Sequence, residues 1–95
     1  MQYVYKISIA DREYKFSWSS TNNLKDYLVK EIEISKKHIK ELQTVLEWYK
    51  SDQSNTNESL AVQNELLETM TMESEKIYTY NIIIKKILKK EFTRE

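Results

Sequence analysis

The fold is decided by residues 28–49, which read LVKEIEISKKHIKELQTVLEWY. An apolar or small residue recurs there every three or four positions, and most charged residues fall between these positions. The recurring residues are Leu28, Ile32, Ser35, Ile39, Leu42, Leu46 and Tyr49. This spacing puts them on one face of an α-helix. It predicts a helix over residues 23–50 that buries this face.

A second stripe with the same spacing follows a polar stretch. Residues 51–57 read SDQSNTN, a small and unpatterned run that predicts a tip loop. Residues 58–92 form the second predicted helix, and its stripe consists of Leu60, Gln63, Leu67, Met70, Ser74, Ile77, Asn81, Ile84 and Leu88, widened by Leu66, Tyr80 and Ile87. Residues 77–84 would also suit a strand, because they are rich in β-branched and aromatic side chains. The helical spacing continues through them, so we expect helix and an antiparallel helical hairpin with coiled-coil character.

The first eighteen residues alternate with a period of two, which is typical of strands. One face carries Tyr3, Tyr5, Ile7 and Ile9, and after residues 10–13 it continues with Tyr14, Phe16 and Trp18. The pattern predicts a β-hairpin over residues 1–18. Because residues 10–13 lack glycine and asparagine, we expect a four-residue loop around a type I turn. A lone hairpin is marginal in water, so its aromatic face should pack on the helices or on a second copy. The expected architecture is one ββαα domain of the α+β class, mainly α.

The composition excludes several classes of site. The chain has no glycine, proline or cysteine, and His38 is its single histidine. Glycine-rich phosphate loops and nucleophile elbows need glycine, and structural zinc sites need cysteine or several histidines. Only Glu41 is placed on the same helix to orient His38, so we expect His38 to be an ordinary helix residue. We therefore expect no enzyme, no cofactor and no metal.

The charges sum to zero but are unevenly distributed. From Glu58 to Glu75 every charged residue is acidic, and from Lys76 to Lys90 every charged residue is basic. On a continuous helix Lys85 would stand beside Lys89 and Lys86 beside Lys90, forming a basic ledge. Such a ledge could contact phosphate, an anionic membrane surface or an acidic protein. It could equally complement the helix dipole. A nucleic-acid-associated regulator is the alternative function.

The leading functional hypothesis is a protein–protein interaction module. Trp48 lies one position off the first stripe and Tyr49 lies on it, both next to the tip loop, and tryptophan and tyrosine are frequent anchors in interfaces. We expect Trp48 to be partly exposed. Apolar residues also outnumber the positions that one neighbouring helix can cover, which predicts a homodimer. The expected protein is a cytoplasmic inhibitor or assembly adaptor without a membrane span. Its isoleucine-rich and lysine-rich, glycine-poor composition is typical of phage and mobile-element proteins that bind host proteins.

The layout of a β-hairpin followed by two amphipathic helices resembles small bacterial cell-division accessory proteins that bundle the tubulin-like ring. Those proteins usually carry a glycine in the hairpin turn, where this chain has Ala10-Asp11-Arg12-Glu13. The resemblance is one of layout and includes no residue motif.

Overall fold

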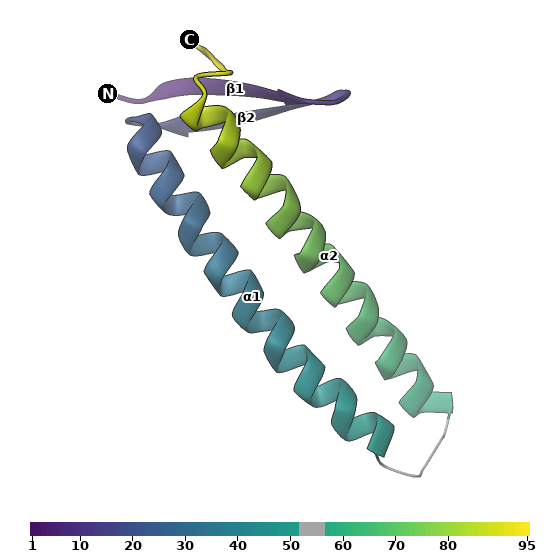
Figure 1. Cartoon of the computed structure of the whole chain (residues 1–95). Helices are drawn as coiled ribbons and strands as arrows, with labels where there is room; N and C mark the ends of the chain where they lie inside the picture. The colour runs from purple at the N-terminus through teal and green to yellow at the C-terminus, as the bar shows by residue number, and fades with distance from the viewer. Residues whose placement is uncertain (52–56) are drawn as a thin grey trace.

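The computed structural model describes residues 1–51 and 57–95. The elements in chain order are β1 (Tyr3–Ile9), β2 (Arg12–Trp18), α1 (Thr21–Ser51), α2 (Asn57–Leu88) and β3 (Thr93–Arg94). The two helices run side by side as a hairpin, and the sheet lies across the end at which α1 begins and α2 ends (Figure 1). The molecule is elongated, at 55 × 25 × 22 Å. The predicted ββαα arrangement is confirmed. Of the predicted tip loop, residues 51 and 57 belong to the helices, and residues 52–56 lie outside the described part.

Strands β1 and β2 form the predicted antiparallel hairpin. Their register pairs Tyr5 with Phe16 and Ile7 with Tyr14, and the last pair is Ile9 with Arg12. The turn therefore has two residues, Ala10 and Asp11, and the prediction of a four-residue loop was wrong. Ala10 has a φ of 53°, and Asp11 has no positive φ. A positive φ at the first central residue alone is the pattern of a type II′ turn, whose twist matches that of the strands. Alanine adopts it at a cost in energy that glycine would avoid.

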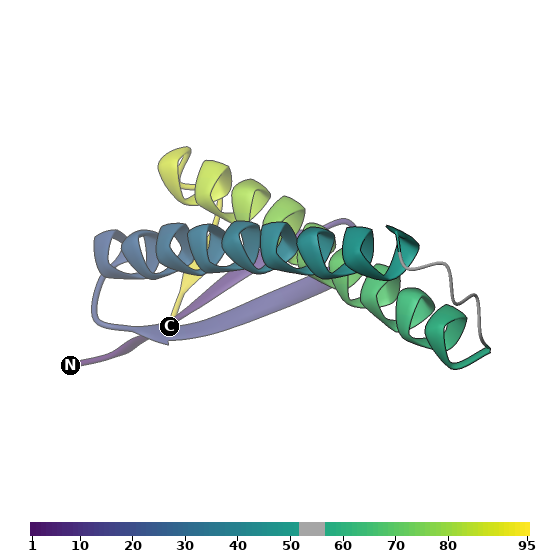
Figure 2. The same cartoon turned by 90° about the horizontal axis from the view of Figure 1, so that it is seen from below.

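The main core lies where the sheet meets the two helices. It joins the middle of β1 to the start of α1 and the end of α2, and its buried members are Tyr5, Ile7, Leu24, Leu28, Ile83 and Ile87. The other rings of the hairpin face, including Tyr14, Phe16 and Trp18, are partly buried against it. Seen from below, the two helices cross at an angle, and the strands lie beside the end of the pair at which α1 begins (Figure 2). The expected packing of the aromatic face on the helices is thus confirmed.

Helix α1 begins with a serine cap. The Ser20 side-chain oxygen accepts a hydrogen bond from the backbone N–H of Asn23 (3.1 Å), and the Ser20 carbonyl accepts the first helical bond, from the N–H of Leu24. This is the usual role of serine at a helix N-cap. The helix starts two residues before the predicted start. Each residue of its predicted stripe, from Leu28 to Tyr49, is buried or half-buried, so the helical phase of α1 is confirmed.

Helix α2 is helical throughout residues 77–84, as expected, but its innermost face is not the predicted one. We call its inward face the inner stripe; its members are buried or half-buried and comprise Ser59, Val62, Leu66, Thr69, Glu73, Lys76, Tyr80, Ile83 and Ile87. The predicted stripe lies one residue further along the chain, a rotation of about 100°. None of its nine central residues is buried, whereas the three residues by which the sequence widened it, Leu66, Tyr80 and Ile87, do lie on the inner stripe. The prediction was wrong because two neighbouring faces share the same spacing, and periodicity alone cannot choose between them.

Helix α2 ends at Leu88, whereas the sequence predicted an end at residue 92. Lys90 has a φ of 58°, its N–H donates to the carbonyl of Ile87, and the N–H of Glu91 donates to the carbonyl of Lys86 (2.8 Å). These two bonds define a Schellman cap, which usually has glycine in the place of Lys90. Beyond the cap, Phe92 packs edge-on against the ring of Tyr5, at a centroid distance of 5.6 Å.

Strand β3 follows this cap and pairs antiparallel with β1, which gives the sheet order β2-β1-β3. The backbone groups of Val4 and Glu95 exchange hydrogen bonds of 3.2 and 2.9 Å. The ammonium group of Lys6 bonds the side chain of Glu95, and the guanidinium group of Arg94 lies 4.6 Å from the centroid of the Tyr3 ring. The two ends of the described chain are therefore held together on one sheet.

Candidate interaction surface

The face of α2 that the sequence had assigned to the core is a surface. We call it the outer stripe, and it comprises Leu60, Gln63, Leu67, Met70, Ser74, Ile77, Asn81, Ile84 and Leu88. Leu60, Leu67 and Leu88 are 48%, 45% and 65% exposed, and Met70, Ile77 and Ile84 are half-buried. No member of the outer stripe carries a charge, although the chain is one-third charged residues. A solvated helix face is normally the charged one.

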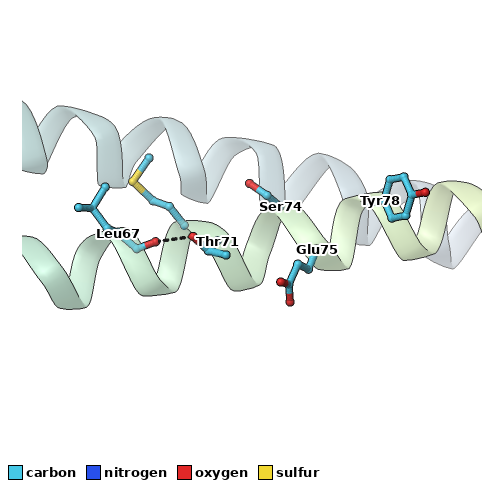
Figure 3. A pocket seen from close by; sticks show the side chains of 6 residues that line it. Leu67, Thr71, Ser74, Glu75 and Tyr78 are labelled. Atoms are coloured by element: carbon cyan, nitrogen blue, oxygen red, sulfur yellow. Dashed lines mark hydrogen bonds between the residues drawn. The ribbon is translucent and has the colours of Figure 1, made fainter. Parts of the chain in front are cut away.

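The middle of the outer stripe is hollowed (Figure 3). Leu67, Met70 and Ser74 line this hollow together with Thr71, Glu75 and Tyr78. The Thr71 hydroxyl donates a hydrogen bond to the carbonyl of Leu67 (2.9 Å), as the dashed line in Figure 3 marks. The Tyr78 ring is 70% exposed. The hollow therefore combines apolar side chains with a hydroxyl already bonded to its own helix, and only Glu75 brings a charge.

The inner stripe, in contrast, contains charged residues. The Lys76 ammonium lies 3.0 Å from a carboxylate oxygen of Glu31 on α1. The Nδ1 atom of His38 lies 3.6 Å from a carboxylate oxygen of Glu73. Between them Ser35 is 1% exposed, and its hydroxyl oxygen has no hydrogen-bond partner among the described residues. These five residues form a polar layer across the helix pair. The sequence missed it because it depends on contacts between the two helices: His38 lies against Glu73 of α2, whereas the sequence offered only Glu41, on the same helix, as a residue that could orient it.

The polar layer shifts the pKa of two of its members. The Ser35 hydroxyl, followed by the charges of Lys76 and His38, lowers the pKa of Glu73. Because the Ser35 oxygen does not reach hydrogen-bonding geometry, its effect is that of a nearby dipole and not of a formed bond. Glu31 raises the pKa of Lys76. Both shifts favour the charged forms of Glu73 and Lys76, so the layer sets two charged residues of α2 against α1.

A serine, a histidine and a glutamate meet in this layer, yet their geometry does not suit catalysis. The Ser35 hydroxyl oxygen has less than 1 Å² of accessible surface, so a substrate cannot reach it. A nucleophile must lie at a site that the reacting atom can enter. Among residues 1–51 and 57–95 no cluster of acidic and histidine side chains is arranged to hold a metal ion. The layer can pair charges between the helices, and its geometry supports no chemical step.

Trp48 is exposed as the sequence predicted. Its side chain is 60% exposed on the last turns of α1, and its ring meets that of Tyr49 edge-on at a centroid distance of 4.9 Å. Tyr49 itself is half-buried. Tyr49 is therefore held against the helix pair, while Trp48 is presented to solvent.

The lysine cluster is not the continuous ledge that the sequence predicted. The N–H of Lys89 still donates to the carbonyl of Lys85, so these two keep helical spacing, but the left-handed backbone of Lys90 removes it from the helix. The Lys86 ammonium lies 3.7 Å from a carboxylate oxygen of Glu91. Lys86 and Lys90 line a hollow that Glu91 and Glu13 also line. Acidic groups thus interrupt the basic patch. None of the described helices combines the length and the apolar character needed to cross a membrane.

Comparison with known proteins assigns no relative to this chain. A scan of protein-family models, a search of curated proteins and a search of solved structures each returned no match.

Proposed function

We propose that this chain is a non-enzymatic protein–protein interaction module that associates with itself and binds a further protein partner. The observation that carries the proposal is the outer stripe. Its nine residues are uncharged, although exposed Lys85 lies between Asn81 and Leu88 on the same face, and ion pairs of Glu31, Glu73 and Lys76 share the helix–helix contact with apolar residues. Leu60, Leu67 and Leu88 are thus left exposed on a helix face that a free helical hairpin would normally make charged.

Energetics favour a protein covering on this surface. Full burial of a leucine, isoleucine or methionine side chain contributes about 1.5–3 kcal/mol relative to exposure. In the isolated chain Leu60, Leu67 and Leu88 gain only about half of this burial free energy, because each side chain is about half exposed or more. A partner helix laid along the outer stripe would recover it. Exposed apolar side chains gathered on one helix face are typical of an interaction site.

Trp48 supplies a second, separate contact for the partner. It is an exposed tryptophan on the last turns of α1, and α1 ends at the far end of the molecule from the sheet (Figure 1). Tryptophan is enriched among the few residues that supply most of the affinity of an interface. We infer that the module acts by occupying a surface of its partner, as an inhibitor or an assembly adaptor. It is suited to the cytoplasm, where a chain without cysteines loses nothing to reducing conditions. The composition suits a phage or mobile-element origin.

The test is the mass of the protein in solution. Size-exclusion chromatography with light scattering over a concentration series should give a mass that rises from 11.5 kDa towards twice that value. Leu67→Lys places a charge in the middle of the outer stripe and should hold the protein monomeric. Lys40→Ala, at an exposed position on α1, is the matched control and should leave self-association unchanged. A mass of 11.5 kDa at every concentration would count against the proposal.

The nucleic-acid alternative is weaker on this structure because Lys86 is paired with Glu91 and Lys90 has left the helix. Binding through Lys85 and Lys89 would fall steeply with salt. A mobility-shift assay with nucleic acid at low salt checks this alternative function, and the absence of a shift would exclude it.

A further inference from the structure

Strand β2 forms an open edge of the sheet. The strand order is β2-β1-β3, so β1 lies on one side of β2, and no strand among residues 1–51 and 57–95 pairs with its other side. The strand is seven residues long, and its register with β1 runs without a bulge from Arg12 to Trp18. This edge is therefore regular and long enough to pair with a further strand.

The pairing within the sheet fixes which backbone groups face outward from this edge. Val4 exchanges both of its backbone hydrogen bonds with Glu95 on β3, so these groups point away from β2. Ser17 is the residue opposite Val4 in the hairpin, and its N–H and C=O groups therefore point away from β1. Because the pattern repeats every two residues, the same holds for Lys15 and Glu13. The outward groups of these residues select an extended peptide, since only another strand offers acceptors and donors at the same spacing.

The opposite side of the sheet shows how such a segment is recognised. Strand β3 has only two residues, yet it pairs with β1 through its backbone. On one face of the sheet the Lys6 ammonium bonds the side chain of Glu95, and on the other face the Arg94 guanidinium lies over the ring of Tyr3. Backbone pairing is thus combined with a charged contact on one face and an aromatic contact on the other.

The side chains of β2 offer the same two kinds of contact at its open edge. Glu13 and Lys15 are exposed, and the Lys15 ammonium lies 3.9 Å from a carboxylate oxygen of Glu13. An antiparallel segment with an acidic residue opposite Lys15 and a basic residue two positions later, opposite Glu13, would complement both charges. The residue between them would lie beside the ring of Tyr14, which packs against the core on the other face. An apolar β-branched side chain suits that place.

We propose that β2 binds an extended segment of the partner protein as a fourth, antiparallel strand of the sheet. The segment has an acidic, an apolar and a basic residue at consecutive positions. This inference rests on the proposed binding of a protein partner and names the form of the segment that is bound. The contact lies at the sheet, whereas Trp48 lies on the last turns of α1, which ends at the far end of the molecule (Figure 1). Either contact can therefore be removed without the other.

Two synthetic peptides with blocked ends test the proposal. The protein used is Leu67→Lys, because its charged outer stripe should keep it monomeric. The peptide Thr-Val-Glu-Val-Lys-Val-Thr places its glutamate opposite Lys15 and its lysine opposite Glu13 in an antiparallel pairing. The control peptide Thr-Val-Lys-Val-Glu-Val-Thr has the same composition and the reverse order of charges. We expect the first peptide to bind about tenfold more tightly, because the control sets like charges opposite each other at both positions.

Hydrogen exchange of single backbone amides, followed by NMR spectroscopy, locates the bound peptide. The N–H groups of Glu13, Lys15 and Ser17 should exchange more slowly when the first peptide is added, because they gain hydrogen-bond acceptors. The N–H groups of Tyr14 and Phe16 point towards β1, so their exchange should change little.

Lys15→Pro removes one outward donor and leaves the bonds between β1 and β2 in place, and proline is tolerated at such positions of edge strands. Lys15→Ala is the matched control, because it also lacks the charge but keeps the N–H group. The proline variant should bind the first peptide about tenfold more weakly than the alanine variant. A melting curve checks that each variant is folded. If the proline variant is unfolded, the two peptides and the amide exchange of the Leu67→Lys protein decide the question.

The outcomes separate this proposal from the self-association in the proposed function. Absence of binding, equal affinities for the two peptides, or unchanged exchange of the three outward amides overturns strand pairing alone. A Leu67→Lys protein that dimerises and protects these amides without peptide also overturns it. In that case a second copy of β2, where Glu13 likewise precedes Lys15 by two positions, would occupy the edge. A parent protein that remains monomeric yet binds the first peptide supports strand pairing and overturns self-association.

Discussion

Two residues adopt the left-handed backbone conformation in a chain that has no glycine. Ala10 has a φ of 53° in the hairpin turn, and Lys90 has a φ of 58° at the cap of α2. An L-residue with a side chain pays about 1–2 kcal/mol for this conformation. The chain reverses its direction at both residues, and the sheet depends on both reversals. Ala10 lies in the turn between β1 and β2, and Lys90 turns the chain back towards β1, with which β3 then pairs.

Glycine at position 90 should therefore stabilise the protein. We expect Lys90→Gly to raise the free energy of unfolding by up to about 1 kcal/mol, because the relief of strain exceeds the added entropy of the unfolded chain. Lys89→Gly is the control; its φ is not positive, so it should destabilise. Urea denaturation measures both variants, and a loss of stability for Lys90→Gly would show that the cap is not strained.

Trp48 should matter for binding and little for folding. Because its side chain is 60% exposed, we expect Trp48→Ala to leave the melting temperature within a few degrees of the parent. Its affinity for the protein partner should fall by roughly thirtyfold, which corresponds to the loss of an anchor worth about 2 kcal/mol. A melting curve and a binding titration are needed together. A large loss of stability with unchanged affinity would mean that Trp48 closes the end of the helix pair.

Helix α1 contributes to the core through the apolar residues of its first turns, whereas the residues on its outward face contribute nothing to the core. Leu28 is completely buried against the sheet and α2, and Leu→Ala substitutions at such sites cost about 2–5 kcal/mol. Lys40→Ala, on the exposed face, should change the free energy of unfolding by less than about 0.5 kcal/mol. Similar losses for Leu28→Ala and Lys40→Ala in chemical denaturation would refute this assignment of the face.

The polar layer between the helices should make the stability depend on pH. The folded-state pKa of Glu73 is lowered from its ordinary value of 4.5. The carboxylate thus contributes stability that is fully present above about pH 4.5 and is lost as the pH falls through the lowered folded-state value. Glu73→Gln should have a lower melting temperature at pH 7 and a smaller further drop between pH 5 and pH 3 than the parent. Parallel pH profiles for the two proteins would contradict this role.

The sequence predicts the buried face of α1 but not that of α2, and it does not predict the exact turn and cap positions. The stripe of α1 was predicted in its correct phase because the neighbouring face of the helix is charged. Lys36, Lys37 and Lys40 lie on that face and exclude it from the core. The phase of α2 was not, because its outer stripe is more apolar than the inner stripe, where Glu73 and Lys76 find partners on α1. The turn at Ala10 and the cap at Lys90 were missed because residues other than glycine occupy them. Exposure of Trp48 could be predicted from its position one residue off the stripe.

For the whole molecule, the C-terminal return is a structural element and not a tail. Phe92 packs on Tyr5, and residues 93–95 bond to β1. We expect Phe92→Ala to cost about 1–3 kcal/mol, which is less than for a fully buried phenylalanine because Phe92 is half-buried. Thr93→Ala, on an exposed side chain, should cost far less. Thermal unfolding compares the two, and a Phe92→Ala protein as stable as the parent would indicate that the return is incidental.

The backbone pairing of Val4 with Glu95 also bears on how the chain folds during translation. The central strand β1 is synthesised before both helices, and its neighbour β3 is synthesised after them. Tyr5 and Ile7 cannot be covered until Ile83 and Ile87 have emerged from the ribosome, so the hairpin stays uncovered while both helices are being made. Contacts between segments so distant in sequence form late and slowly. The interval before Ile83 and Ile87 emerge is therefore when the hairpin is most exposed to aggregation and to capture by chaperones.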